Sequence, residues 1–225
     1  MAQPVIVAID GPSGTGKSST SRAVAAKLGL RYLDTGAQYR AMTWWMLTNG
    51  VDVNDPVAVA DSAGKPAIVS GTDPVTPVVT VDGEDATGPI RSQEVTAAVS
   101  AVSAVPAVRA RMVEFQRAAA AAAPAGIVVE GRDIGTTVLP DATVKIFLTA
   151  SPEVRAARRS SELKGAQSLA ETQAALIRRD AVDAGRVTSP LAKAPDATEV
   201  DTTELTLEQV VECVVTLVEE KRAAR

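Results

Sequence analysis

The chain has 225 residues, of which 46% are hydrophobic and 22% charged, an ordinary globular composition that excludes a disordered chain. Its formal net charge of −4 disfavours a nucleic-acid partner, because proteins that grip a phosphate backbone carry a basic excess. Histidine is absent and Cys213 is the single cysteine, which excludes an internal disulfide, a histidine-dependent triad and a zinc site. The N-terminus has no basic leader and no apolar run reaches membrane-spanning length, so we expect a cytoplasmic protein without a membrane partner.

The first 60 residues alternate between short apolar segments and helical patterns. Residues 5–9 form a β-branched run that suits a buried parallel strand. The pattern then predicts a helix from 17 to 28 that ends at Gly29. A second short strand is expected at 32–34, followed by a helix through 39–47. This order is typical of an α/β domain.

The pattern changes between residues 61 and 93. Segments 66–70 and 77–81 are β-rich, and Asp82-Gly83 is a hairpin signal. Hairpins inside an alternating α/β chain predict a small antiparallel insertion at 61–93. The core domain would then comprise residues 1–60 and 94–225.

The remaining chain returns to the α/β pattern. It predicts helical structure over 93–123, two buried strands at 127–130 and 144–148, and a helix that starts at Ser151-Pro152. A last helix opens at Thr206 with a capping-box pattern and continues as a stripe of valines at helical spacing.

A glycine-rich segment between the first strand and the first helix matches the P-loop pattern G-x-x-x-x-G-K-[ST]. Such a loop turns its backbone N–H groups toward phosphate oxygens, and the dipole of the following helix adds to the attraction. Lys17 would reach the β- and γ-phosphates, and the Ser18 hydroxyl would ligate Mg²⁺. The residues expected to bind the triphosphate are Gly11, Pro12, Ser13, Gly14, Thr15, Gly16, Lys17, Ser18 and Ser19. The fold class predicted is a P-loop α/β three-layer sandwich with a parallel central sheet.

Isolated arginines distinguish between the kinases and the GTPases among P-loop proteins. The guanine-reading N-K-x-D motif of GTPases does not occur in the sequence. Arg155, Arg158 and Arg159 fall at i, i+3 and i+4 of one predicted helix and so share one face. Two phosphate chains that meet in one cleft need several permanently charged guanidinium groups. The arginines therefore favour a kinase with two phosphorylated substrates.

Further segments resemble the signatures of bacterial cytidylate kinases. They are Asp34–Arg40, Gly88–Val95, Glu130–Gly135, Pro140–Leu148, and Arg178–Asp180 with Arg186. Together they span nearly the whole chain in matching order and spacing. The resemblance implies that the insertion at 61–93 binds the monophosphate and that a short helical lid at about 152–170 closes over ATP. Glu130 departs from the pattern, since some relatives have Asp there.

The resemblance also implies roles for individual residues. The CMP-binding positions would be Thr35, Arg40, Ser100, Arg109, Arg132, Asp133, Arg179 and Asp183. Within this set Arg40 and Arg132 would clamp the phosphate, and Asp133 would accept a hydrogen bond from the cytosine amino group. The catalytic cations would be Lys17, Arg132, Arg155, Arg158 and Arg159.

The expected function is phosphorylation of CMP, and of dCMP, by ATP and Mg²⁺, giving the diphosphate and ADP. No general base is required, because the acceptor phosphate oxygen is already nucleophilic. Two alternatives stay open at this point. One is a P-loop kinase for UMP or for a non-nucleotide acceptor, and the other is a nucleotide-dependent switch module without transfer chemistry. We expect small-molecule partners only and a monomer.

Overall fold

The computed structural model describes residues 4–162 and 168–224. Residues 163–167, which belong to the expected lid, lie outside the described residues. The central sheet has five parallel strands in the order β2-β6-β1-β7-β8. These strands are β1 (Val5–Asp10), β2 (Arg31–Asp34), β6 (Gly126–Gly131), β7 (Val144–Thr149) and β8 (Thr198–Asp201). Burial on both sides explains why β1 and β6 are runs of apolar residues.

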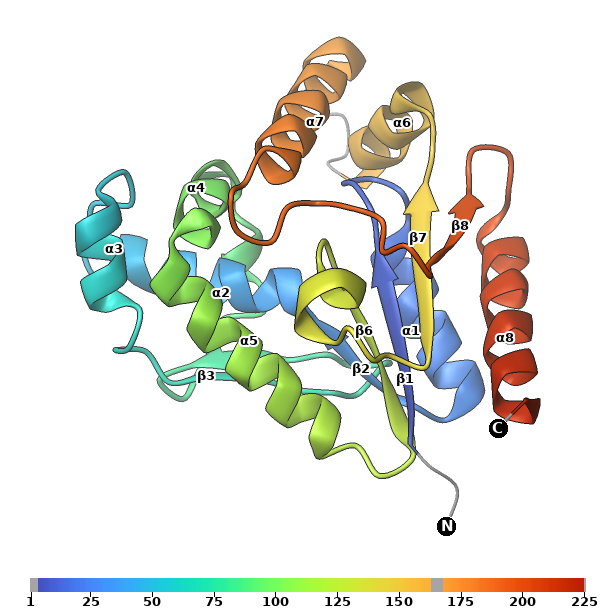
Figure 1. The fold of residues 1–225 in the computed structure, drawn as a ribbon. Coiled ribbons are helices and arrows are strands. Elements are labelled where there is room, and N and C mark those ends of the chain that lie inside the picture. Colours follow the sequence, from blue (N-terminus) through green and yellow to red (C-terminus); the bar gives the residue numbers. More distant parts are fainter. Residues whose placement is uncertain (1–3, 163–167, 225) are drawn as a thin grey trace.

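Helices cover both faces of the sheet, which confirms the α/β three-layer prediction (Figure 1). On one face α1 (Lys17–Leu28) and α8 (Leu207–Ala223) pack against β1 and β7. The valines of α8 enter this core, and the Thr206 side chain caps the helix as its sequence predicted. On the opposite face α5 (Pro106–Ala121) packs against β6.

A second, antiparallel sheet lies beside the central one. Its strands are β3 (Ile68–Ser70), β4 (Val79–Val81) and β5 (Glu84–Asp85). It shares a separate core with α2 (Thr35–Thr48), α3 (Pro56–Ser62), α4 (Gln93–Ala104) and part of α5. A short 3-10 turn, Pro89–Arg91, leads into α4. The antiparallel strands occur within the range where the sequence predicted them.

Two further helices lie beyond the carboxyl ends of the parallel strands (Figure 1). They are α6 (Pro152–Glu162) and α7 (Leu169–Ala184). A single π-helical turn, Ile134–Val138, follows β6. In open α/β sheets, ligands bind at this edge, where the chain reverses the direction in which it adds strands to the sheet. Here the reversal occurs at β1, which has β6 and β2 on one side and β7 and β8 on the other. No helix among the described residues is both long and apolar enough to span a membrane.

Candidate active site

The loop between β1 and α1 has the glycines that its conformation requires. Gly14 adopts φ +81°, and a Cβ atom there would lie 2.9 Å from the carbonyl oxygen of Arg155 on α6. A Cβ atom on Gly11 would collide with the backbone of Leu148 on β7. Gly16, at φ +87°, precedes the first residue of α1. Side chains at Gly11 and Gly14 would push the loop away from β7 and α6, and a side chain at Gly16 would strain its left-handed backbone.

Lys17 lies at the bottom of this loop and is buried. Its Nζ donates to the carbonyl oxygen of Pro12 at 2.6 Å. Burial lowers the pKa of Lys17, and the positive charge of Arg132 lowers it further. Glu130 and Asp10 act in the opposite direction. A phosphate group placed near Nζ would favour the charged lysine in the same way.

The Ser18 hydroxyl is hydrogen-bonded to a buried carboxylate from β6. Ser18 Oγ donates to Glu130 Oε2 at 3.0 Å, and the Tyr32 hydroxyl donates to Glu130 Oε1. Burial raises the pKa of Glu130, and Asp34 raises it further, while Lys17 lowers it. A hydroxyl beside a carboxylate is an oxygen donor set that suits Mg²⁺ bound mainly through substrate phosphates. The residues present therefore fit the metal that the P-loop implies.

A cavity of about 290 Å³ opens above Lys17. It is bounded by the P-loop, the start of α2, the segment after β6, and residues of α4, α5, α6 and α7. Most of the residues expected to bind substrates line it. These are Ser13, Gly14, Gly16, Lys17, Ser18, Ser19, Thr35, Arg40, Arg109, Arg132, Asp133, Arg159, Arg179 and Asp183.

Four guanidinium groups from four separate segments converge in this cavity: Arg40, Arg132, Arg159 and Arg179. Burial lowers the pKa of Arg40 to about 10, and repulsion from Arg159 contributes. Arg179 has the same shift, caused by burial and then by Arg132 and Arg40. The Nε atom of Arg179 is buried and has no hydrogen-bond partner in the described part of the chain. Positive charges held this close favour an anionic ligand.

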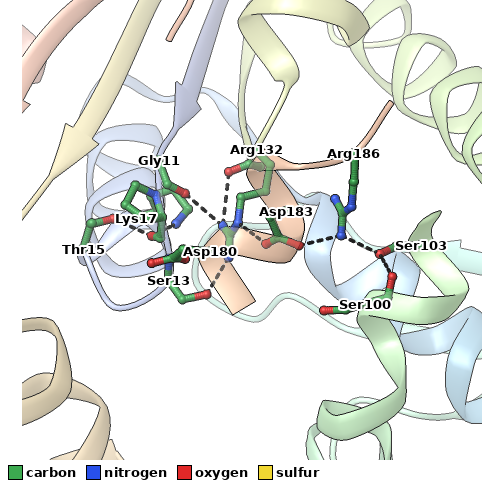
Figure 2. Close-up of polar contacts among 12 residues, drawn as sticks. Gly11, Ser13, Thr15, Lys17, Ser100, Ser103, Arg132, Asp180, Asp183 and Arg186 are labelled. Carbon is green, nitrogen blue, oxygen red and sulfur yellow. Dashed lines mark hydrogen bonds and ion pairs between the residues drawn. The ribbon is translucent and has the colours of Figure 1, made fainter. Parts of the chain in front are cut away.

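A chain of polar contacts joins the P-loop to α4 (Figure 2). Arg132 donates to the carbonyl oxygen of Gly11 at 3.0 Å and to Ser13 Oγ at 2.6 Å. Its Nε pairs with Asp183, which also accepts from Arg186 at 2.6 Å. Arg186 in turn donates to Ser103 Oγ at 2.9 Å. The two ends of the cavity are thus connected through Arg132, which follows β6, Asp183 on α7, and Arg186, which follows α7.

The far end of the cavity holds a buried ion pair. Arg109 Nη2 donates to Asp133 Oδ2 at 2.5 Å, and both side chains are less than 10% exposed. The Arg109 guanidinium also lies 5.5 Å from the centre of the Tyr39 ring. Asp133 is fixed by its position directly before the π-helical turn, whose Ile134 and Gly135 amides donate to Asp10. This end can offer both a carboxylate and a guanidinium to a flat polar ring.

The three arginines of α6 take three different directions. Arg159 lines the cavity. Arg158 donates to the hydroxyl and the carbonyl oxygen of Thr202, after β8, at 2.8 and 2.7 Å. Arg155 is buried against the P-loop, where it contacts the Ser13 carbonyl oxygen and Asp180. Neither Arg155 nor Arg158 lines the cavity.

Ser100 also lies away from the cavity lining. Its carbonyl oxygen accepts from Ser103 Oγ at 3.2 Å, and Ser103 lines the cavity (Figure 2). The binding role of Ser100 stays a prediction. Ser103 and Asp10 had no signal in the sequence beyond their residue type, whereas Tyr39 lies within the segment Asp34–Arg40 that resembles cytidylate kinases. Arg186 was part of the resemblance without an assigned role, and its contacts with Ser103 and Asp183 connect it with the site.

Comparisons with known proteins agree with this geometry. A family model described as cytidylate kinase matches residues 7–220. The cytidylate kinase of Streptomyces griseus is 76% identical over 220 residues, covering 98% of this chain and 95% of that protein. The cytidylate kinase of Mycobacterium leprae is 49% identical over 223 residues, covering 98% of each.

A solved structure also resembles the fold. It is an uncharacterized protein from Eubacterium ventriosum, with a TM-score of 0.54 at 10% identity, and the match covers 97% of this chain and 99% of that one. At this identity the likeness concerns the fold alone. The family match and the identity to curated relatives carry the assignment: the chain belongs to the cytidylate kinase family and is a kinase, a transferase of phosphoryl groups.

Proposed function

We propose that the protein transfers the γ-phosphoryl group of Mg-ATP to CMP, and also to dCMP, giving ADP and the nucleoside diphosphate. The observation that carries this proposal is the convergence of Arg40, Arg132, Arg159 and Arg179 in the cavity that also contains Lys17. A P-loop accounts for one polyphosphate, and the additional guanidinium groups provide for a second phosphate ester. Family membership makes CMP the first candidate for that ester.

The proposed chemistry needs alignment and charge neutralisation. A phosphate oxygen of CMP attacks the γ-phosphorus, and ADP leaves from the opposite side. Lys17 and Arg159 stabilise the charge that spreads over the transferring group, while Arg132 and Arg179 hold the acceptor phosphate. Ser18 would hold Mg²⁺ beside Glu130, and the bound metal supplies further neutralisation at the phosphate oxygens. Arg155 and Arg158 would act by holding the P-loop and the loop at Thr202.

The base would be read at the far end of the cavity. Asp133 can accept a hydrogen bond from the exocyclic amino group of cytosine, and Arg109 can donate to the ring acceptors. Uracil presents an oxygen where cytosine has the amino group, so the Asp133 carboxylate disfavours UMP. The insertion, residues 61–93, would contribute Ile90 and Arg91 of its 3-10 turn to the acceptor side of the cavity.

A panel of acceptors tests the proposal. Purified protein with Mg-ATP is offered CMP, dCMP, UMP, AMP and shikimate, and ADP release is measured for each. We expect rapid turnover with CMP and dCMP and at least tenfold lower kcat/KM with UMP. Preference for a non-nucleotide would replace the proposed acceptor, and slow ATP hydrolysis without acceptor dependence would favour a switch module.

A further inference from the structure

The carboxylate of Asp180, on α7, contacts the P-loop although it is 167 positions away in the sequence. Asp180 Oδ1 accepts from the backbone N–H of Ser13 at 3.2 Å, and Figure 2 shows the two residues side by side. Its other oxygen pairs with Arg155 Nη1 from α6. Neither contact is part of the nucleotide-binding roles described above. Asp180 thus joins three segments: the P-loop, α6 and α7.

All three polar groups of Ser13 are held by residues from outside the P-loop. The N–H group donates to Asp180, the carbonyl oxygen accepts from Arg155 at 3.2 Å, and Oγ accepts from Arg132 at 2.6 Å. The next residue is Gly14, whose left-handed backbone lies against the backbone of Arg155. The curl of the phosphate-binding loop is therefore fixed from α6 and α7 before any nucleotide arrives.

The Asp180–Arg155 pair is shielded from solvent. The side chains are 17% and 9% exposed, and the Nε atom of Arg155 is buried without a partner in the described part of the chain. Removing the carboxylate would leave the buried Arg155 guanidinium without its counter-charge. Arg155 could reduce the energy of this unpaired charge only by moving toward solvent. Such a movement would release the Ser13 carbonyl oxygen that Arg155 holds. Asp180 also helps to keep Lys17 charged, since its negative charge raises the pKa of that lysine.

The helix that carries Asp180 also faces the acceptor. Arg179 and Asp183 lie four positions apart on one face of α7 and line the cavity, whereas Asp180 is turned by about 100° toward the P-loop. One rigid helix therefore sets the position of the donor loop relative to the acceptor residues.

We propose that Asp180 is a positioning residue for phosphoryl transfer: it holds Ser13 and Arg155 so that the P-loop keeps its nucleotide-binding shape at a fixed distance from Arg179 and Asp183. This inference rests on the proposed function in one respect, that the P-loop binds ATP. A purely structural role would instead affect only the thermal stability of the chain.

The test uses Asp180→Asn, which keeps the size of the side chain and an acceptor for the Ser13 N–H but removes the charge opposite Arg155. We expect kcat/KM for ATP to fall at least tenfold and the affinity for a non-hydrolysable ATP analogue to fall in parallel. The dissociation constant of CMP should change less than threefold. Arg178→Gln, which alters an exposed side chain two residues away on the same helix, is the matched control and should leave all three values unchanged.

A double-mutant cycle with Arg155→Lys separates positioning from stability, because a single ammonium group cannot reproduce the planar fork that contacts both Asp180 and Ser13. If Asp180 acts through Arg155, the second substitution adds less than threefold to the loss in kcat/KM for ATP. If Asp180→Asn does not fold, kcat/KM for ATP and the affinity for the ATP analogue are measured on Arg155→Lys alone. Additive losses, or a lowered melting temperature with unchanged kcat/KM and analogue affinity, would refute the inference. A wild-type protein that binds no ATP analogue would overturn the proposed function itself.

Discussion

Removing the carboxylate of Asp133 should destabilise the fold as well as affect base recognition. In Asp133→Ala the Arg109 guanidinium keeps its hydrogen bond to the Ser103 carbonyl oxygen at 3.3 Å but loses the one counter-charge that the described residues place against it in a buried site. Breaking one partner of a buried ion pair costs roughly 3–5 kcal/mol. For a chain of this size that corresponds to a fall in melting temperature of about 6–20 °C.

Thermal unfolding followed by circular dichroism measures this change without any substrate. Asp141→Ala, an exposed aspartate before β7, is the control and should melt with the wild type. The double variant Arg109→Met with Asp133→Ala should recover most of the loss, because both charges are then gone. A single Asp133→Ala variant that melts within about 2 °C of the wild type would refute the reasoning from burial. Asp133→Asn, which keeps the shape and one acceptor, is therefore the better variant for measuring CMP specificity.

Three further perturbations follow from the same contacts. Lys17→Ala should lower kcat by about 100-fold or more while the melting temperature stays within a few degrees, since one phosphate-facing cation is lost; near-normal turnover would remove Lys17 from the mechanism. Tyr32→Phe removes the donor that orients the Glu130 carboxylate, so the Mg²⁺ concentration for half-maximal turnover should rise several-fold; an unchanged Mg²⁺ requirement would contradict this role. Burial raises the pKa of Asp10 from 3.8 to about 6, so its contribution to stability is complete below pH 3.8 and is lost as the pH rises through 6. The stability advantage of the wild type over Asp10→Asn, measured by urea unfolding, should therefore shrink by roughly 2–3 kcal/mol between pH 4 and pH 7, and an advantage that grows with pH would contradict the assignment.

The sequence correctly predicted those helices and strands whose hydrophobic period and end residues lie close together in the chain. The helix at 17–28, the strands at 127–130 and 144–148, and the capped last helix are all present, with bounds shifted by a residue or two. Each combines an apolar period with a stop or start residue, so a short window contains the information. The helices α3 and α7 and the strand β8 were not singled out. α3 and β8 are short, and α7 buries Thr172, Leu176 and Asp183 rather than a continuous apolar stripe.

Site residues that depend on long-range contacts were harder to place. The spacing of Arg155, Arg158 and Arg159 put them on one helical face, but it could not show which neighbour each guanidinium meets. That depends on Thr202 and Asp180, which come from distant parts of the chain. The same limit applies to Ser103, which lines the cavity without having been named from the sequence, while the role of Ser100 stays a prediction. Helical periodicity defines a face, but the tertiary packing decides which residues of that face line a cavity.

The arginine cluster gives the strongest link between electrostatics and function. Even with pKa values lowered to about 10, Arg40 and Arg179 remain almost fully charged at pH 7. Deprotonation at neutral pH therefore does not remove the cost of burying these charges close together. Each lowered pKa corresponds to a destabilisation of the charged guanidinium by roughly 3 kcal/mol. An anion that enters the cavity offsets this energy directly, whereas a neutral ligand of the same shape leaves it in place. The fold thus carries an unfavourable arrangement of charge that a phosphate ester would relieve. We therefore expect the cavity to select for phosphorylated acceptors before it distinguishes one base from another.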